Sequence, residues 1–229
     1  MILSPFSFYG LSVSITVISC PLCLATNSEI FHQDKQRQYF SCQQCQLVFA
    51  DRATLLTPQQ ELAQYQLHQN DVHDKGYRQF LQRLATPLLQ SLPASRLHGL
   101  DFGCGPGPLL AKMLSEAGHK MALWDPFFAN QPEVLQRQYD FISCSEAIEH
   151  FVNPCQEWAL WLKLLKPGGT LAIMTKRYTT AAAFASWHYK NDPTHISFFA
   201  TATFRYLAQR DGFDLSVADN DVVILQRKH

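Results

Sequence analysis

The chain lacks an excess of charge of either sign, because 19 Lys and Arg balance 19 Asp and Glu over 229 residues. It therefore has no global field that would draw it to nucleic acid, which argues against RNA or DNA as the default ligand. Internal repeats and low-complexity tracts are also missing. With 47% hydrophobic residues, the chain can bury a substantial core and is not disordered. Its length fits one ordinary domain with a small appendage.

The N-terminal segment lacks charge altogether, since no charged side chain occurs from Ile2 to Ser28. A secretory signal needs a basic segment, and a spanning helix needs about 20 apolar residues. Residues 17–20 resemble a lipoprotein cleavage site, but acylation would remove Cys20 from the cysteine pairs. We expect residues 1–19 to be an extension of unknown role and the chain to have no membrane span.

The seven Cys are not spaced like a disulfide framework. Four of them form Cys20-Pro-Leu-Cys23 and Cys42-Gln-Gln-Cys45, a spacing that predicts a tetrahedral four-thiolate zinc site within a ribbon of residues 20–50. Because thiolates would fill all four positions, the predicted metal is structural. Metal-bound thiolates fit a reducing, cytoplasmic location, and redox-active cysteines are the alternative. The remaining three are expected at strand ends and a helix start: Cys104, Cys144 and Cys155.

Strands and helices alternate in residues 97–229, which predicts an α/β domain with a mostly parallel sheet covered on both faces. Strands are expected at 97–102, 120–124, 139–144, 169–174, 213–217 and 222–226, and helices at 109–117, 154–165 and 202–210. The last two strands form an antiparallel hairpin around Asn220-Asp221. Residues 57–92 are expected to be a helical linker or lid, with Thr57 and Gln60 as a capping box and Gly76 between two helices.

A glycine-rich turn lies between the first strand and the first helix of this domain. Asp101-Phe102-Gly103-Cys104-Gly105-Pro106-Gly107 ends the strand, and glycine there permits a sharp turn and close approach to a ligand. The N–H groups at the helix start can bind an anionic group. Asp125 ends the next strand, where a carboxylate can bridge two ribose hydroxyls. These features predict a nucleoside site.

The segment closely resembles motif I of the class I S-adenosylmethionine-dependent methyltransferases, written DxGxGxG. Its third glycine comes one position too early for the dinucleotide-binding pattern GxGxxG. The resemblance implies a Rossmann-like fold, and it implies that Asp125 holds the ribose of S-adenosylmethionine. It also implies which residues hold the methionine end of the cofactor: Asp101, Gly103, Gly105 and Gly107.

Two further segments resemble the same family. Residues 139–150 resemble its fourth-strand motif, which usually ends in a Glu-His pair and here makes Ser145 a further cofactor candidate. Residues 165–169 resemble the turn before its fifth strand. The resemblance covers about residues 97–226, but only about fifteen residues separate Asp125 from Asp140. We therefore expect the third strand to be reduced or missing.

The missing third strand leaves the adenine-contacting acid of the family without a counterpart. Phe127 and Phe128 either cover the adenine or pack in the core. Trp158 and Trp161 are expected in the core, on a helix packed against the sheet.

The candidate catalytic residues follow the fifth strand, at the edge where such sheets bind ligands. Asp192-Pro193-Thr194-His195 resembles a DPxH element of zinc-ribbon-bearing family members. We expect His195 to be a general base, oriented by Asp192, with a pKa of about 6.5. The alternative is that His195 caps the next helix or binds the backbone. His150 with Glu149 is a second candidate pair. Residues 65–70 resemble a YxxHxN element, which fits either a lid or a solvated helix.

The leading hypothesis is methyl transfer from S-adenosylmethionine to a small-molecule acceptor, with the zinc ribbon as a structural cap or docking surface. An RNA acceptor is the second hypothesis, although Lys35, Arg37 and Arg52 are its only basic signs in the ribbon. A non-catalytic module that binds the cofactor and a partner is the third. Nicotinamide-dependent oxidoreduction is the fourth.

Overall fold

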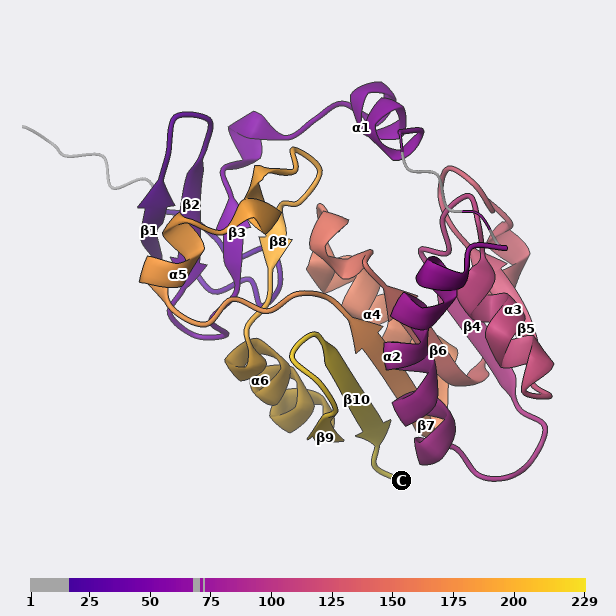
Figure 1. The fold of residues 1–229 in the computed structure, drawn as a ribbon. Helices are drawn as coiled ribbons and strands as arrows, with labels where there is room; N and C mark the ends of the chain where they lie inside the picture. Colours follow the sequence, from indigo (N-terminus) through magenta and orange to yellow (C-terminus); the bar gives the residue numbers. More distant parts are fainter. Residues whose placement is uncertain (1–16, 68–70, 72) are drawn as a thin grey trace, which may run out of the picture.

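The computed structural model describes residues 17–67, 71 and 73–229, which are arranged as two adjoining sheets with flanking helices (Figure 1). The larger sheet has the strand order β5-β4-β6-β7-β10-β9. No helix within these described ranges is long and apolar enough to cross a membrane. Most of the N-terminal extension, together with His68 and Asn70 of the YxxHxN element, lies outside the described residues.

The larger sheet confirms the predicted α/β fold with a mostly parallel sheet. Four of its strands are parallel neighbours: β4 (His98–Phe102), β5 (Lys120–Trp124), β6 (Tyr139–Ser145) and β7 (Leu165–Met174). The last two, β9 (Phe213–Val217) and β10 (Val222–Arg227), pair as the predicted antiparallel hairpin, and β10 continues onto β7. β6 is apolar and buried along most of its length, as expected for a strand covered on both faces.

Helices cover both faces of this sheet (Figure 1). On one face, α2 (Lys75–Ser91) packs against β7 and β10 and α3 (Leu109–Glu116) packs against β4 and β5, and both helices bury apolar side chains in one core cluster. On the other face, α4 (Pro154–Leu164) and α6 (Thr201–Asp211) pack in the largest core cluster. Trp158 and Trp161 belong to this second cluster and are 2% and 1% exposed, which confirms their core assignment.

The smaller sheet combines segments that are far apart in the sequence. Its strands are β1 (Ser28–Gln33), β2 (Gln38–Cys42), β3 (Val48–Ala50) and β8 (Ser197–Phe198), paired antiparallel in that order. The sequence indicated a ribbon within residues 20–50 but did not indicate β8, which comes from residues 197–198. Cys42 and Phe40 lie in the same core cluster as Trp161, so the cores of the two sheets are continuous.

Short elements connect these layers. They are η1 (Arg52–Thr54), α1 (Pro58–Tyr65), η2 (Pro132–Gln136), η3 (Ile148–His150), α5 (Ala181–Ala185) and η4 (His188–Asn191). In the described chain no strand lies between β5 and β6, where the sequence predicted a reduced or missing third strand, and η2 occupies this place. β5 therefore forms the edge of the larger sheet.

Helix starts follow local capping chemistry. The Thr57 side chain accepts from the Gln60 N–H at 3.3 Å, and Gln60 accepts from the Thr57 N–H at 2.9 Å, which confirms the predicted capping box. The prediction that Gly76 separates the two helices is wrong. Asp74 caps α2 by accepting from the Gly76 N–H at 2.7 Å, so Gly76 lies inside the first turn.

Candidate functional site

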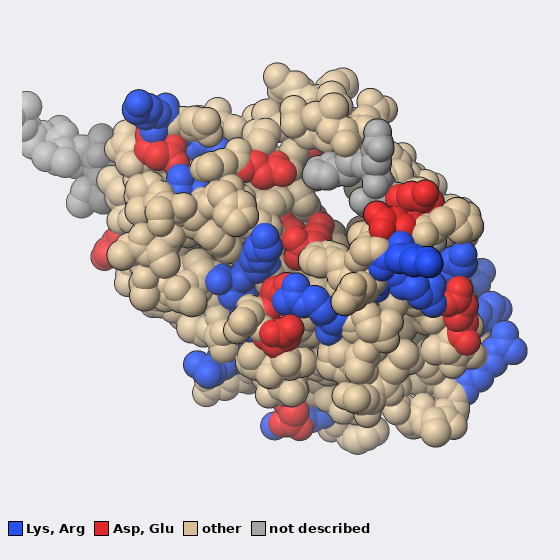
Figure 2. Space-filling model, in the orientation of Figure 1, with Lys and Arg blue, Asp and Glu red and all other residues tan. Residues whose placement is uncertain are grey.

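A cleft of about 680 Å³ opens at the carboxyl ends of β4, β5 and β6. Figure 2 shows this hollow below α1, with acidic side chains in it. The cleft brings together every predicted cofactor and catalytic residue outside the cysteine pairs. These residues are Asp101, Gly103, Gly105, Gly107, Asp125, Ser145, His150, Asp192 and His195.

The glycine loop has a conformation that requires glycine at two positions. Gly103 and Gly105 have φ values of +76° and +62°, in the region that side chains with a Cβ disfavour. A Cβ on Gly103 would also lie 2.5 Å from the Cβ of Ala147. The loop is anchored to the neighbouring strand, because the Gly103 N–H donates to the Trp124 carbonyl at 2.7 Å. The backbone is therefore bare and fixed where it faces the cleft.

Asp125 fixes this loop from the end of β5. Its Oδ2 accepts from the Gly105 N–H at 2.9 Å, and its Oδ1 accepts from the N–H groups of Phe127 and Phe128 at 2.9 and 3.0 Å. A carboxylate has about four lone-pair positions, two on each oxygen, so Oδ2 retains acceptor capacity toward the cleft. Asp125 both shapes the loop and lines the cleft.

Asp101 lies at the floor of the cleft and is 3% exposed. Its Oδ1 accepts from the Ser143 hydroxyl at 2.7 Å. Burial raises the pKa of Asp101 to about 6, although the hydrogen bond from Ser143 opposes the rise. Asp101 is therefore a carboxylate at neutral pH that a cationic group would stabilise.

Aromatic side chains form the outer wall of the cleft. Phe127 and Phe128 follow Asp125, and the Phe127 ring centroid lies 5.6 Å from that of Tyr65 on α1. The Tyr65 hydroxyl donates to Glu61 at 2.6 Å, also on α1. Glu61 and Tyr65 both line the cleft, so α1 covers it. Tyr77 and Phe80 add to the wall from α2.

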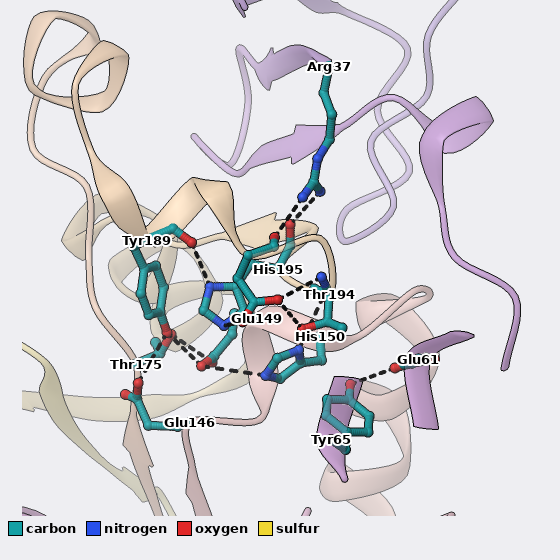
Figure 3. Close-up of polar contacts among 11 residues, drawn as sticks. Arg37, Glu61, Tyr65, Glu146, Glu149, His150, Thr175, Tyr189, Thr194 and His195 are labelled. Carbon is teal, nitrogen blue, oxygen red and sulfur yellow. Dashed lines mark hydrogen bonds and ion pairs between the residues drawn. The ribbon is translucent and has the colours of Figure 1, made fainter. Parts of the chain in front are cut away.

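The far side of the cleft holds two neighbouring imidazoles, His150 and His195, whose ring centroids are 4.7 Å apart (Figure 3). The His195 Nδ1 lies 2.7 Å from the Tyr189 carbonyl oxygen, and the His150 Nδ1 lies 3.1 Å from that of Thr194. Because a carbonyl only accepts, each Nδ1 carries the ring hydrogen and each Nε2 carries a lone pair.

Two details of the predicted His195 site are wrong. Asp192 does not orient the ring through a hydrogen bond, since its Oδ2 is 3.8 Å from the His195 Nε2 and the Tyr189 carbonyl holds Nδ1 instead. Asp192 Oδ1 accepts from the N–H and hydroxyl of Thr194, at 2.8 and 2.6 Å. The pKa of His195 is also not at its ordinary value, because burial lowers it.

Behind the imidazoles lies a buried polar network, of which the sequence had indicated only Glu149 (Figure 3). Glu149 is 1% exposed, and its oxygens accept from the hydroxyls of Tyr189 at 2.5 Å and Thr175 at 2.9 Å. Glu146 has a φ of +47°, lines the cleft, and has its pKa raised to about 8 by burial and by the charge of Glu149. Thr175 and Glu146 directly follow strand ends, which was the signal available for them.

The cysteine ribbon contacts the His195 segment directly. The Arg37 guanidinium donates to the carbonyls of Asp192 and His195 at 2.6 and 2.9 Å, and Arg37 is 7% exposed. The Tyr39 hydroxyl donates to the Lys190 carbonyl at 3.2 Å. β8 begins two residues after His195 and pairs with β3 of the ribbon. The ribbon therefore fixes the backbone on this side of the cleft.

The four predicted metal ligands do meet. One sulfur each from Cys20, Cys23, Cys42 and Cys45 lies within 4.8 Å of the others, so the group could hold a metal ion. Two equivalent turns position them, each closed by a left-handed residue after its second cysteine: Leu24 at φ 64° and Gln46 at φ 60°. The other cysteines occupy the expected positions after β4, in β6 and at the start of α4: Cys104, Cys144 and Cys155.

Most of the sequence matches a known protein family, and the fold is similar to those of solved structures. A family described as a methyltransferase domain matches residues 68–216, and no curated protein matches the sequence. The Burkholderia thailandensis 1,6-didemethyltoxoflavin-N1-methyltransferase, solved with 1,6-didemethyltoxoflavin and S-adenosylhomocysteine, is similar over 88% of this chain and 99% of its own. The identity is 15% and the TM-score is 0.48.

The magnesium protoporphyrin IX methyltransferase of Synechocystis PCC 6803, solved with SAH, is also similar in fold. The similarity covers 67% of this chain and 84% of that one, with 15% identity and a TM-score of 0.46. The family match extends over more than half of the residues. The chain therefore belongs to this family of methyltransferase domains.

Proposed function

We propose that the chain is an S-adenosylmethionine-dependent methyltransferase that acts on a small-molecule acceptor. The observation that supports this most directly is the single cleft that contains both the glycine loop and His195. Its volume of about 680 Å³ fits the range typical of small-molecule sites.

The cofactor side of the cleft uses the glycine loop and its flanking acids. Asp101 would hold the ammonium of the methionine end, next to the bare backbone of Gly103, Gly105 and Gly107. Asp125 would accept from a ribose hydroxyl with the lone pair that its backbone contacts leave on Oδ2, and Ser145 also lines the cleft. When bound, the cofactor supplies an electrophilic methyl group on a positively charged sulfur.

The acceptor side uses the histidines. With the cofactor bound, the acceptor atom would bond to the methyl carbon as the carbon–sulfur bond breaks, and the electron pair of that bond would stay on sulfur as a neutral thioether. The acceptor proton passes to the lone pair on His195 Nε2, whose ring the Tyr189 carbonyl orients. The His150 Nε2 carries a second lone pair on this side. Asp192 Oδ2 lies 3.8 Å from the His195 Nε2 and would stabilise the imidazolium that forms on His195.

The charge of the cleft favours a small molecule over RNA. Seven acidic residues line it, whereas none of the described lining residues is Lys or Arg. RNA binding depends on cationic side chains that neutralise phosphates, so this lining would repel a nucleic-acid backbone. The acidic residues are Glu61, Asp101, Asp125, Glu146, Glu149, Glu157 and Asp192.

We also propose that the four cysteines hold a structural zinc ion. Three of the four residues are fully buried, and the Leu22 and Cys45 N–H groups point at cysteine sulfurs at 3.4 and 3.5 Å, which stabilises thiolates. Four sulfur ligands leave no position for substrate, so the ion would hold the ribbon rather than act in the reaction.

The test is calorimetric titration of the folded protein with S-adenosylmethionine, S-adenosylhomocysteine and NADH, followed by transfer of labelled methyl to a panel of small acceptors. We expect one S-adenosylhomocysteine per chain and no NADH binding. A folded sample without affinity for S-adenosylhomocysteine would contradict the proposal. Loss of labelling in His195→Ala with unchanged cofactor affinity would separate an enzyme from a cofactor-binding module.

A further inference from the structure

We propose that Glu149, His150 and His195 form a second metal site, for a divalent transition-metal ion, on the acceptor side of the cleft. One ligand atom of each residue lies within 4.8 Å of those of the other two. All three residues line the cleft, so a bound ion would face the substrate. The inference rests on the proposed function only in naming that side as the place where the acceptor binds.

The histidines are prepared for coordination by their backbone contacts. Each Nδ1–H is directed at a carbonyl oxygen, of Thr194 for His150 and of Tyr189 for His195. Metal-bound histidines usually donate their other ring N–H in this way, which fixes the tautomer and aims the lone pair of the ligating nitrogen. The Glu149 Oε1 lies 4.0 Å from the His150 Nε2, so a modest contraction would bring both atoms to one ion.

Glu149 is held for the same role from behind. The hydroxyls of Tyr189 and Thr175 each donate to one of its oxygens and leave further lone pairs on both. Such contacts orient a ligating carboxylate and tune its affinity. Among the described residues that line the cleft there is no Lys or Arg to balance the carboxylates, so a cation would provide the missing counter-charge.

The donor set defines the class of ion. Two imidazoles and one carboxylate suit zinc, iron or cobalt better than magnesium or calcium, which prefer oxygen ligands. Three protein ligands leave coordination positions open, in contrast with the four-thiolate site. An ion here would bind an acceptor oxygen and favour loss of its proton to water. Proton and metal compete for the His195 Nε2, so its role as a base belongs to the metal-free protein.

Cobalt(II) is the probe, added to zinc-loaded protein after a chelator has removed weakly held metal. Metal content, calorimetry and visible absorption follow binding, because cobalt at thiolates gives strong sulfur charge-transfer bands and cobalt at nitrogen and oxygen does not. We expect one cobalt per chain without those bands. Binding should weaken at least tenfold in Glu149→Gln and His195→Gln, and be unchanged in the exposed control His188→Ala.

Three results would overturn the site: no cobalt binding, charge-transfer bands that disappear in Cys23→Ser, or equal affinity in Glu149→Gln and wild type. Tyr189→Phe is a milder variant that keeps all three ligands, and we expect it to weaken cobalt about tenfold. S-adenosylhomocysteine binding is measured in every sample. If the cofactor binds and cobalt does not, only the metal site fails; if the cofactor does not bind, the proposed function fails.

Discussion

Arg37 Nη1 lies 2.9 Å from the carbonyl oxygen of His195, so a side chain of the cysteine ribbon holds the backbone of the proposed general base. The same guanidinium holds the carbonyl of Asp192. The cysteine ribbon is thereby connected to the proposed acceptor side of the cleft through a buried cation and two carbonyls.

Replacing Arg37 with Ala should slow methyl transfer without weakening cofactor binding. Two carbonyls would lose their donor, at a cost of about 1–3 kcal/mol for each buried group left unsatisfied. We expect kcat to fall at least tenfold, with the Kd for S-adenosylhomocysteine within twofold of wild type. Arg52→Ala is the matched control, because its contacts to Val152 and Asn153 are long and exposed. If Arg37→Ala lost as much cofactor affinity as kcat, the substitution would have disrupted the fold of the whole cleft.

Gly103→Ala should abolish tight cofactor binding. The new Cβ would meet Ala147 at 2.5 Å and force a shift in the loop. Gly118→Ala separates this clash from backbone strain, since Gly118 has a φ of +99° but no atom within 4 Å of its added Cβ. Calorimetry should show at least a tenfold weaker Kd for S-adenosylhomocysteine in Gly103→Ala only. Similar affinities in the two variants would mean that the loop does not hold the cofactor.

Cofactor affinity should depend on pH through Asp101. Its pKa is raised to about 6 by burial, so the carboxylate is charged above that pH and neutral below it. Attraction for the ammonium of the cofactor is therefore complete at pH 7 to 8 and is lost as the pH falls through 6. Titration across pH 5 to 8 checks this, and Asp101→Asn should bind weakly with a flatter profile. If the pH profile of cofactor affinity in Asp101→Asn matched that of wild type, a group other than Asp101 would cause the pH dependence.

Methyl transfer at low metal should follow the ionisation of His195. Burial lowers the pKa of its imidazole, so the base is neutral and active at pH 7 and becomes protonated only at lower pH. The rate should rise with pH to a plateau, with a midpoint below about 6.5, the ordinary value for histidine. His195→Ala should lose at least a hundredfold in rate. His188→Ala, an exposed neighbour, should retain both rate and profile.

Cys42→Ser should remove the zinc and destabilise the whole chain. Cys42 is fully buried in the core cluster that also contains Trp161. Structural zinc contributes about 10 kcal/mol of folding free energy, comparable to the total stability of a domain. We expect one chelator-resistant zinc per wild-type chain, none in Cys42→Ser, and a much lower melting temperature. Cys155→Ser, outside the cluster, should keep its zinc and its melting temperature.

Regular sequence patterns predicted the central sheet and the cleft well. Three strands of that sheet, β5, β7 and β10, have a continuous apolar stretch, and the Gly103–Gly107 turn with Asp125 requires a specific backbone shape that few residues allow. The start of a helix could also be predicted where a capping side chain precedes it, as Thr57 precedes α1. Gly76 misled the prediction because glycine also occurs in a first helical turn, where Asp74 supplies the cap.

The geometry of the acceptor side was harder to predict from the sequence, because it depends on contacts between segments that are distant in the chain. Nothing local to Arg37 indicates that it binds the carbonyls of residues 192 and 195. The orientation of His195 was assigned to Asp192 because a nearby carboxylate is the usual partner in sequence. The structure uses the Tyr189 carbonyl instead, and main-chain acceptors leave no mark in a sequence.

β8 is two residues long, yet it closes a sheet whose other strands lie within the first fifty residues. During synthesis the cysteines leave the ribosome before β4, β5, β6 and β7, whereas the strand that completes their sheet emerges after all four. Pairing over such a sequence separation is slow to form. Metal capture would therefore keep the early turns in place until β8 arrives, and the ribbon would finish folding together with the acceptor side of the cleft.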